Sequence, residues 1–78
     1  MSKENDLSRY VRKAVDGYMK DLDGEPPCAI YDMVIQCVER PLIEAVLEHA
    51  EGNQTRAAEM LGLNRNTLRK KMQFHRIK

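Results

Sequence analysis

The sequence lacks any long apolar segment. No run approaches the roughly 20 apolar residues that cross a bilayer, and the N-terminus has no apolar signal-peptide core. Glycine-rich phosphate loops, internal repeats and low-complexity tracts are also missing. We therefore expect a soluble, cytoplasmic protein with no membrane partner. At 78 residues it forms one domain at most, and because so small a monomer buries only about 60% of its unfolded surface, dimerisation is the expected support.

Cysteine and histidine are scarce. Cys28 and Cys37 form no CxxC pair and have no histidine pair at metal-site spacing, so we interpret both as reduced thiols. His49 and His75 stand alone, without a carboxylate or cysteine constellation. We predict no metal, no cofactor, no catalytic residue and no small-molecule substrate, and nothing in the sequence indicates an enzyme.

Positive and negative charges are separated along the chain, although the net charge is only +1. Residues 1–51 carry six basic and eleven acidic side chains, a net charge of −5, and residues 52–78 carry seven basic and one acidic, a net charge of +6. We interpret the carboxylates of the first half as solvated surface. From Asn64 to Lys78 there are six cations and no acid. This asymmetry indicates a polyanionic partner for the C-terminal end only.

A first helix is predicted over residues 7–21, where apolar residues recur at three-and-four spacing and form one stripe. Asp6 is the predicted N-cap. The helix should end within residues 23–27, Asp-Gly-Glu-Pro-Pro, because glycine favours the C-terminal cap and proline cannot continue the hydrogen-bond ladder. The stripe consists of Leu7, Tyr10, Val11, Ala14, Val15, Tyr18, Met19 and Leu22.

A second helix is predicted over residues 29–50. Pro41 either kinks it or stops and restarts it, and because the apolar spacing stays in phase across the proline we favour one kinked helix. One line of this helix holds Ile30, Val34, Val38, Pro41, Leu42, Ala45, Val46 and His49, and Met33, Ile35, Cys37, Ile43 and Leu47 widen the apolar surface. A helix that is apolar on several sides must be covered on several sides. A second subunit is the economical cover; the alternative is a monomer that folds back on its C-terminal helices.

The C-terminal third predicts a helix-turn-helix. Asn53 caps a helix over residues 54–61, and Asn64 caps a second helix from Arg65 to about Phe74. Ala58 is small at the predicted crossing, and Gly62 permits the positive backbone angle of the turn. Leu61, Leu63, Leu68 and Met72 lie at the spacing of core residues.

The outward residues of these helices suit a helix laid in the major groove of double-stranded DNA. Arg65, in the first turn of the second helix, can donate two hydrogen bonds to guanine. Asn64 and Asn66 flank it, and we expect Asn64 to act both as cap and as base contact. Hydroxyls, cations and helix N-termini bind phosphate, and on this basis the phosphate contacts are Asn53, Thr55, Thr67, Arg69, Lys70 and Lys71. RNA is the weaker option, because one phenylalanine and three tyrosines provide no stacking surface.

These motifs carry a family resemblance. Residues 52–58 read GNQTRAA, residues 62–65 read GLNR and residues 67–71 read TLRKK. Together with Glu39-Arg40-Pro41-Leu42 upstream, they make residues 7–74 resemble the bacterial Fis family, the factor for inversion stimulation. The resemblance implies an intertwined homodimer whose paired recognition helices bend DNA and favour an A/T-rich centre. It also assigns DNA contacts to Asn53, Thr55, Asn64, Arg65, Thr67, Arg69 and Lys70.

Several positions depart from the family pattern. Glu51, Gln73 and Phe74 stand where well-known members are basic, which predicts weaker contacts to flanking DNA. Asn66 replaces a common glycine. Only six residues precede Leu7, which argues against a recombination-enhancer arm. The last helices also resemble those of nitrogen-regulation-type enhancer-binding activators, but the chain begins with Met and leaves no room for their ATPase domain.

We therefore expect an all-α, Fis-like domain over residues 1–78 with four helices. Residues 1–6 form a frayed tail, residues 7–50 the dimerisation helices and residues 51–78 the helix-turn-helix. The predicted function is a nucleoid-associated transcriptional regulator that binds and bends DNA with little sequence specificity. The alternative is a protein-interaction module of a bacterial signalling system whose basic helix is incidental.

Overall fold

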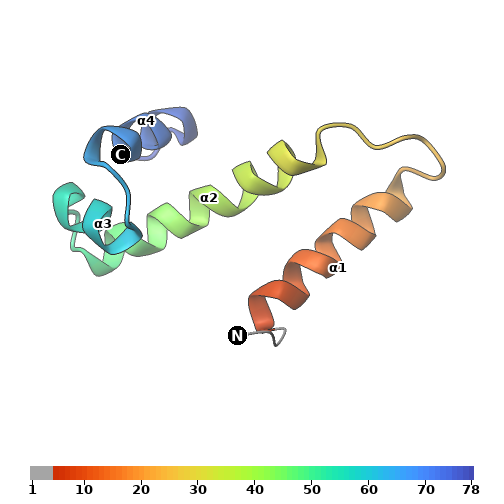
Figure 1. Cartoon of the computed structure of the whole chain (residues 1–78), viewed down its shortest axis with the longest axis horizontal. Coiled ribbons are helices and arrows are strands. Elements are labelled where there is room, and N and C mark those ends of the chain that lie inside the picture. Colours follow the sequence, from red (N-terminus) through yellow and green to blue (C-terminus); the bar gives the residue numbers. More distant parts are fainter. Residues whose placement is uncertain (1–4) are drawn as a thin grey trace. The chain divides into compact units, whose positions relative to one another are not determined.

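The structure, a computed structural model, describes residues 5–78. Within that range it contains four α-helices and no strand, which confirms the all-α fold class (Figure 1). The helices are α1 (Asp6–Asp21), α2 (Ile30–His49), α3 (Gln54–Leu61) and α4 (Arg65–His75). No helix of this range combines the length and the apolar character that crossing a bilayer requires.

The start of α1 corrects two expectations. Asn5, not Asp6, is the N-cap: its backbone is extended and its Oδ1 accepts a hydrogen bond from the backbone nitrogen of Ser8 at 2.8 Å. Asp6 is the first helical residue and pairs with Arg9 one turn further on. Asparagine and aspartate cap helices about equally well, so the sequence alone does not choose between neighbours. Residues 5 and 6 form the cap and the first position of α1, so the prediction of a frayed tail is wrong for them. Residues 1–4 of that predicted tail lie outside the described residues.

Pro41 lies inside α2, which continues without interruption from Ile30 to His49. This confirms the prediction of one helix rather than a helix that stops and restarts at Pro41. Proline lacks the backbone N–H that would bond to the carbonyl of Cys37, so α2 carries one hydrogen bond fewer than its length allows. The kink itself stays a prediction.

The chain divides into two compact units, residues 1–34 and residues 35–78. The first contains α1, the connecting segment and the start of α2. No residue of α1 is buried, and among its apolar residues Leu7, Tyr10 and Met19 are exposed. The apolar stripe predicted for this helix is therefore present but has no buried position in a single chain.

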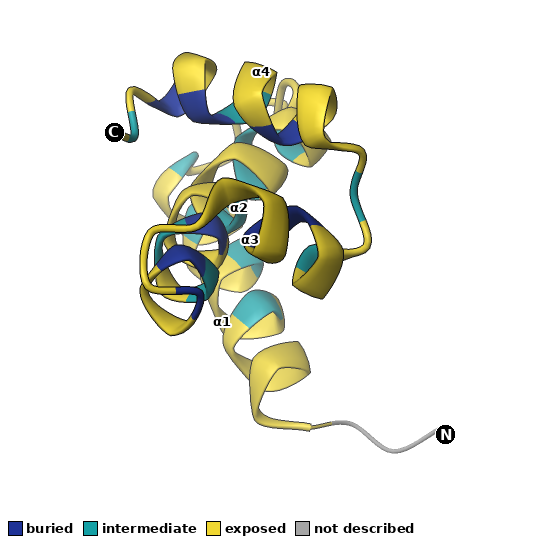
Figure 2. Ribbon diagram, turned by 90° about the vertical axis from the view of Figure 1, so that its left-hand side faces the viewer, coloured by how far each residue is buried: buried dark blue, intermediate teal, exposed yellow. Residues whose placement is uncertain are grey.

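The second unit contains a small apolar core that joins the C-terminal half of α2 to α3 and α4 (Figure 2). Leu61 is partly buried and packs against this core, and Leu63 is half-buried. The last turns of α2 therefore belong to the core of the helix-turn-helix. The boundary between the two units, at residues 34 and 35, lies well before the change of charge near residue 51. The buried residues are Ile43, Leu47, Ala50, Ala57, Ala58, Leu68 and Met72.

Three of the helices end in the same hydrogen-bonded turn. After α3, the backbone nitrogen of Leu63 donates to the carbonyl of Ala58 at 2.9 Å, and Gly62 takes the left-handed conformation with φ of +75°. The turns after α2 and α4 place Glu51 and Arg76 in the same conformation, with φ of +56° and +57°. Only α3 has glycine at this position, which is why its end is the one most clearly predicted from the sequence.

Candidate nucleic-acid interface

The position of α4 is set by the short turn that follows α3, and an asparagine caps the start of each of the two helices. Asn53 Oδ1 accepts from the backbone nitrogen of Arg56 at 3.1 Å, and Asn64 Oδ1 accepts from that of Asn66 at 2.8 Å. Both predicted caps are confirmed. Between them Gly62 ends α3, so only two residues separate it from the first residue of α4. The turn leaves α4 little freedom relative to α3.

The small side chains of α3 let α4 approach closely. Ala57 and Ala58 are 0% and 3% exposed, and Leu68 of α4 is 0% exposed in the same core. Met72 lies one turn after Leu68 and is also buried. This confirms the core role predicted for Ala58, Leu68 and Met72. The core face of α4 is thereby defined, and the opposite face is free to meet a ligand.

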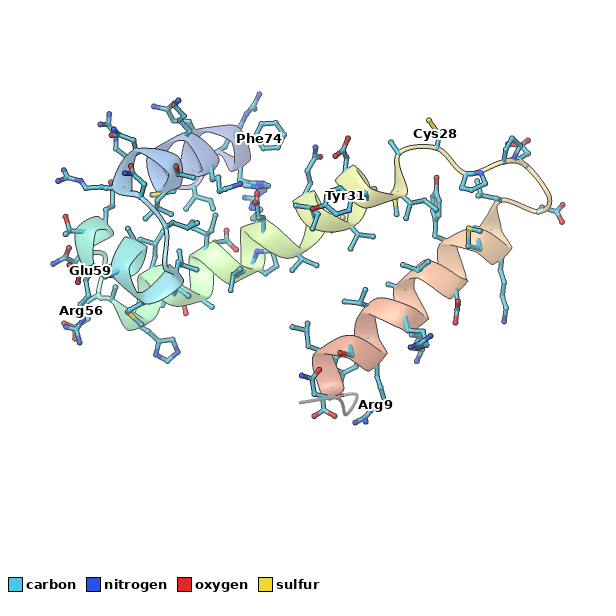
Figure 3. All side chains as sticks on the ribbon, viewed as in Figure 1. Arg9, Cys28, Tyr31, Arg56, Glu59 and Phe74 are labelled. Atoms are coloured by element: carbon cyan, nitrogen blue, oxygen red, sulfur yellow. The ribbon has the colours of Figure 1, made fainter. Side chains whose placement is uncertain are left out.

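The outward face of α4 is polar and basic. Residues at positions 66, 69, 70 and 73 surround a shallow hollow on this face, as expected for side chains three and four apart on a helix. Arg65 and Thr67 are exposed beside them. On α3, Arg56 and Glu59 project from the outer side of the helix, and Phe74 projects from α4 (Figure 3). The surface around α4 is therefore mostly cationic and amide-bearing, with Phe74 as an exposed apolar neighbour.

The structure brings the eight predicted contact residues onto one helix pair but gives them unequal surroundings. They come from the cap and first turn of α3 and from the cap and body of α4. Lys71 is half-buried. The exposed members are Asn53, Thr55, Asn64, Arg65, Thr67, Arg69 and Lys70.

Lys71 belongs to a polar cluster that the sequence did not predict. Its Nζ lies 2.5 Å from Glu39 Oε2 of α2, and Nε2 of His75 lies 3.0 Å from Glu39 Oε1. The side chain of His75 is 6% exposed, that of Glu39 21% and that of Lys71 34%. The interpretation of all carboxylates of the first half as solvated surface is therefore wrong for Glu39. A single carboxylate joins two α4 residues, four positions apart, to α2.

The surroundings of Glu39 favour its charged form. The hydrogen bond with Lys71, and secondly that with His75, lowers the pKa of the Glu39 carboxyl below its ordinary value, although partial burial opposes the shift. The ring of His75 also meets that of Phe74 edge-on, with centroids 5.0 Å apart. His75 is thus a structural residue of the second unit. No local pattern in the sequence predicts this cluster, because residues 39, 71 and 75 come together only when α2 and α4 pack.

The remaining candidate groups offer little chemistry. Cys28 and Cys37 are free and exposed. Among residues 5–78 no group of three or more histidine, cysteine, aspartate or glutamate side chains is arranged to hold a metal ion. The surface of α3 and α4 is therefore the chemical feature that stands out in the described chain.

Comparison with known proteins agrees with this geometry. The family model described as "Bacterial regulatory protein, Fis family" matches residues 35–74. A Fis-like relative from Ralstonia nicotianae is 56% identical over 71 residues, covering 91% of this chain and 92% of its own length. Proteins named DNA-binding protein Fis from Glaesserella parasuis and Psychromonas ingrahamii are 48% and 51% identical over 66 residues, covering 85% of this chain and 67% of theirs. The chain belongs to the Fis family of bacterial regulatory proteins.

Proposed function

We propose that this chain is a transcriptional regulator that binds double-stranded DNA as a homodimer and bends it. The observation that carries the proposal is the exposed surface of α3 and α4, where seven predicted contact residues lie on a helix-turn-helix that packs on the last turns of α2. The names of relatives that are described as DNA-binding support the same ligand. The protein then acts at the nucleoid in the cytoplasm.

The contact residues divide into base readers and phosphate binders. Arg65 lies in the first turn of α4, where a side chain reaches deepest into the major groove, and its guanidinium donates to guanine O6 and N7. Asn64 uses Oδ1 for capping, so its amide nitrogen is the group that faces the base edge. The phosphate binders are Asn53, Thr55, Thr67, Arg69 and Lys70, in keeping with their hydroxyl, amide and cationic groups.

The homodimer is supported by an apolar face of α2 that the core of the single chain does not use. Ile43 and Leu47 are buried against α3 and α4. Val38, Leu42 and Ala45 follow the same spacing on another side of the helix, and Leu42 is 48% exposed. This second face, together with the exposed Leu7, Tyr10 and Met19 of α1, suits the α1 and α2 helices of a second copy. The bundle would hold two copies of α4 at a fixed separation.

DNA bending follows if that separation is shorter than one turn of B-DNA, about 34 Å. Both recognition helices then enter adjacent major grooves only when the duplex bends and its central minor groove narrows. The free energy of this deformation is smallest for A/T-rich centres that compress readily. Most of the sequence preference would therefore come from DNA shape, with guanine read near each end.

Mobility shifts of a short A/T-rich duplex, measured at one fixed salt concentration and then over a series of salt concentrations, test the proposal. Arg65→Ala removes the predicted guanine contact and should weaken binding by about 1–3 kcal/mol. Arg69→Ala removes a phosphate contact from each subunit and should reduce the slope of log affinity against log salt by about 1 per subunit. Arg9→Ala on α1 makes the same charge change outside the interface and is the matched control. If both variants bind like the control, the proposal fails, and a tight protein complex without any DNA shift would favour a protein-interaction module.

A further inference from the structure

Lys70 and Lys71 are neighbours in the chain with different surroundings. Lys70 is exposed and lies beside the hollow on the outward face of α4. Lys71 lies near the core edge of the same helix, where its ammonium meets Glu39 Oε2 at 2.5 Å. A successive residue on a helix turns by about 100°, which is enough to place one lysine toward a ligand and the other toward α2. The two lysines should therefore contribute differently to DNA binding.

The Glu39 carboxylate depends on both of its α4 partners. Its side chain is 21% exposed, so water replaces a partner that leaves only in part. If Lys71 moved to a phosphate, the carboxylate would keep only the hydrogen bond with His75 at 3.0 Å. The free energy of a new ion pair with phosphate would be offset by breaking the half-buried pair with Glu39. Lys71 is thereby held on the protein side of α4.

We propose that Glu39 is a positioning residue for DNA binding, which holds the C-terminal half of α4 against α2 and keeps Lys71 from the phosphates. The inference rests on the proposed DNA-binding function. Leu68 and Met72 supply apolar contacts on the core face, which are non-directional. The bonds to Glu39 are directional and fix two positions one turn apart. Glu39 thus links the angle of the recognition helix to α2.

Paired lysine variants test the placement of Lys71. Lys70→Gln and Lys71→Gln remove the same charge from adjacent residues, and affinity is measured for one short A/T-rich duplex over a range of salt concentrations. Lys70→Gln should reduce the slope of log affinity against log salt by about 0.9 for each phosphate that the lysine neutralised. Lys71→Gln should lower affinity without changing that slope. An equal reduction of the slope in both variants would show that Lys71 binds phosphate, and would overturn the inference.

Variants of Glu39 test positioning at a temperature where circular dichroism shows every variant folded. Glu39→Ala should bind about threefold to tenfold more weakly, the scale of about one missing interaction. Glu39→Gln retains one oxygen acceptor and should bind more tightly than Glu39→Ala. It should still bind more weakly than the wild type, and this comparison remains if the alanine variant does not fold. A lowered melting temperature with unchanged affinity would assign Glu39 a stabilising role only and overturn the inference. Tighter binding would show simple repulsion of phosphate and would overturn it as well.

The same measurements separate the two proposals. A wild-type chain that gives no shift even at low salt refutes the DNA-binding function and the inference with it. A wild-type shift together with unchanged affinity in the folded Glu39 variants refutes the role of Glu39 and leaves DNA binding standing.

Discussion

Glu39 shows that the free energy of partly burying a charged side chain depends on its hydrogen-bond partners. Moving a carboxylate and an ammonium out of water costs free energy, and their attraction recovers it only when the remaining hydrogen bonds are also made. Glu39 meets that condition because each of its oxygens has a partner on α4. The Arg40–Glu44 pair next to it is exposed, at 56% and 44% of the side-chain surface, and contributes little by comparison.

The pH dependence of stability should report on Glu39. Its pKa is lowered in the folded chain, so its contribution to the free energy of unfolding is complete above the ordinary pKa of glutamate, about 4.3. That contribution is lost as the pH falls through the lowered, folded value. Glu39→Gln removes it, so the melting temperature of the wild type should fall more steeply than that of the variant as the pH drops below about 5.

Thermal unfolding followed by circular dichroism checks this between about pH 7 and pH 3. The control is Glu44→Gln, in which the missing carboxylate is an exposed one, so the slope should stay almost unchanged. A constant offset between the wild-type and Glu39→Gln curves over the whole range would contradict the expected linkage.

At the scale of the element, helix boundaries follow from local chemistry. The caps of α3 and α4 form within their own turns, so Asn53 and Asn64 can be identified from the sequence. The cap of α1 lies one residue before the predicted Asp6, because its neighbour Asn5 offers an equivalent oxygen. Such signals lie among neighbouring residues, so they can be identified without knowledge of the fold. They do not say which face of a helix will be buried.

Pro41 gives a prediction for α2. Because the helix is continuous through residue 41, Pro41→Ala supplies the missing N–H to the carbonyl of Cys37 and removes the clash of the ring. The free energy of unfolding should rise, by up to about 3 kcal/mol. Urea denaturation measures the change, with Gln36→Ala as an exposed control on the same helix. A drop in stability in Pro41→Ala would indicate that the packing of α2 needs the shape proline imposes.

For the whole molecule, the central feature is that different parts of α2 have different surroundings. Its C-terminal turns complete the core of the helix-turn-helix through Ile43 and Leu47. Other apolar side chains of α2, Leu42 among them, remain exposed in the single chain, and Tyr31 is 76% exposed. Tyr10, a member of the apolar stripe predicted for α1, is likewise 72% exposed. A second copy is the cover that we propose for them.

Leu42→Glu tests assembly without disturbing the buried core. A carboxylate at this exposed apolar position would lose hydration on entering a bundle, so the variant should be a monomer at micromolar concentration. Light scattering coupled to gel filtration measures the mass, and Gln36→Glu introduces the same charge at an exposed polar position as a control. The monomer should also show about half the salt slope of the dimer on DNA. A wild-type chain that is itself monomeric would contradict the bundle.

Local patterns in the amino-acid sequence were sufficient for the helices, most of their ends and the family, because periodicity, caps and the motif at residues 52–71 lie close together in the chain. They also indicated the seven residues that lie exposed on α3 and α4. The packing of the helices was needed to place Ile43, Leu47 and Ala50 in the helix-turn-helix core and to pair Lys71. Glu39 lies 32 residues from Lys71 and 36 from His75. Contacts across such separations depend on how helices cross, which no local pattern of residues specifies.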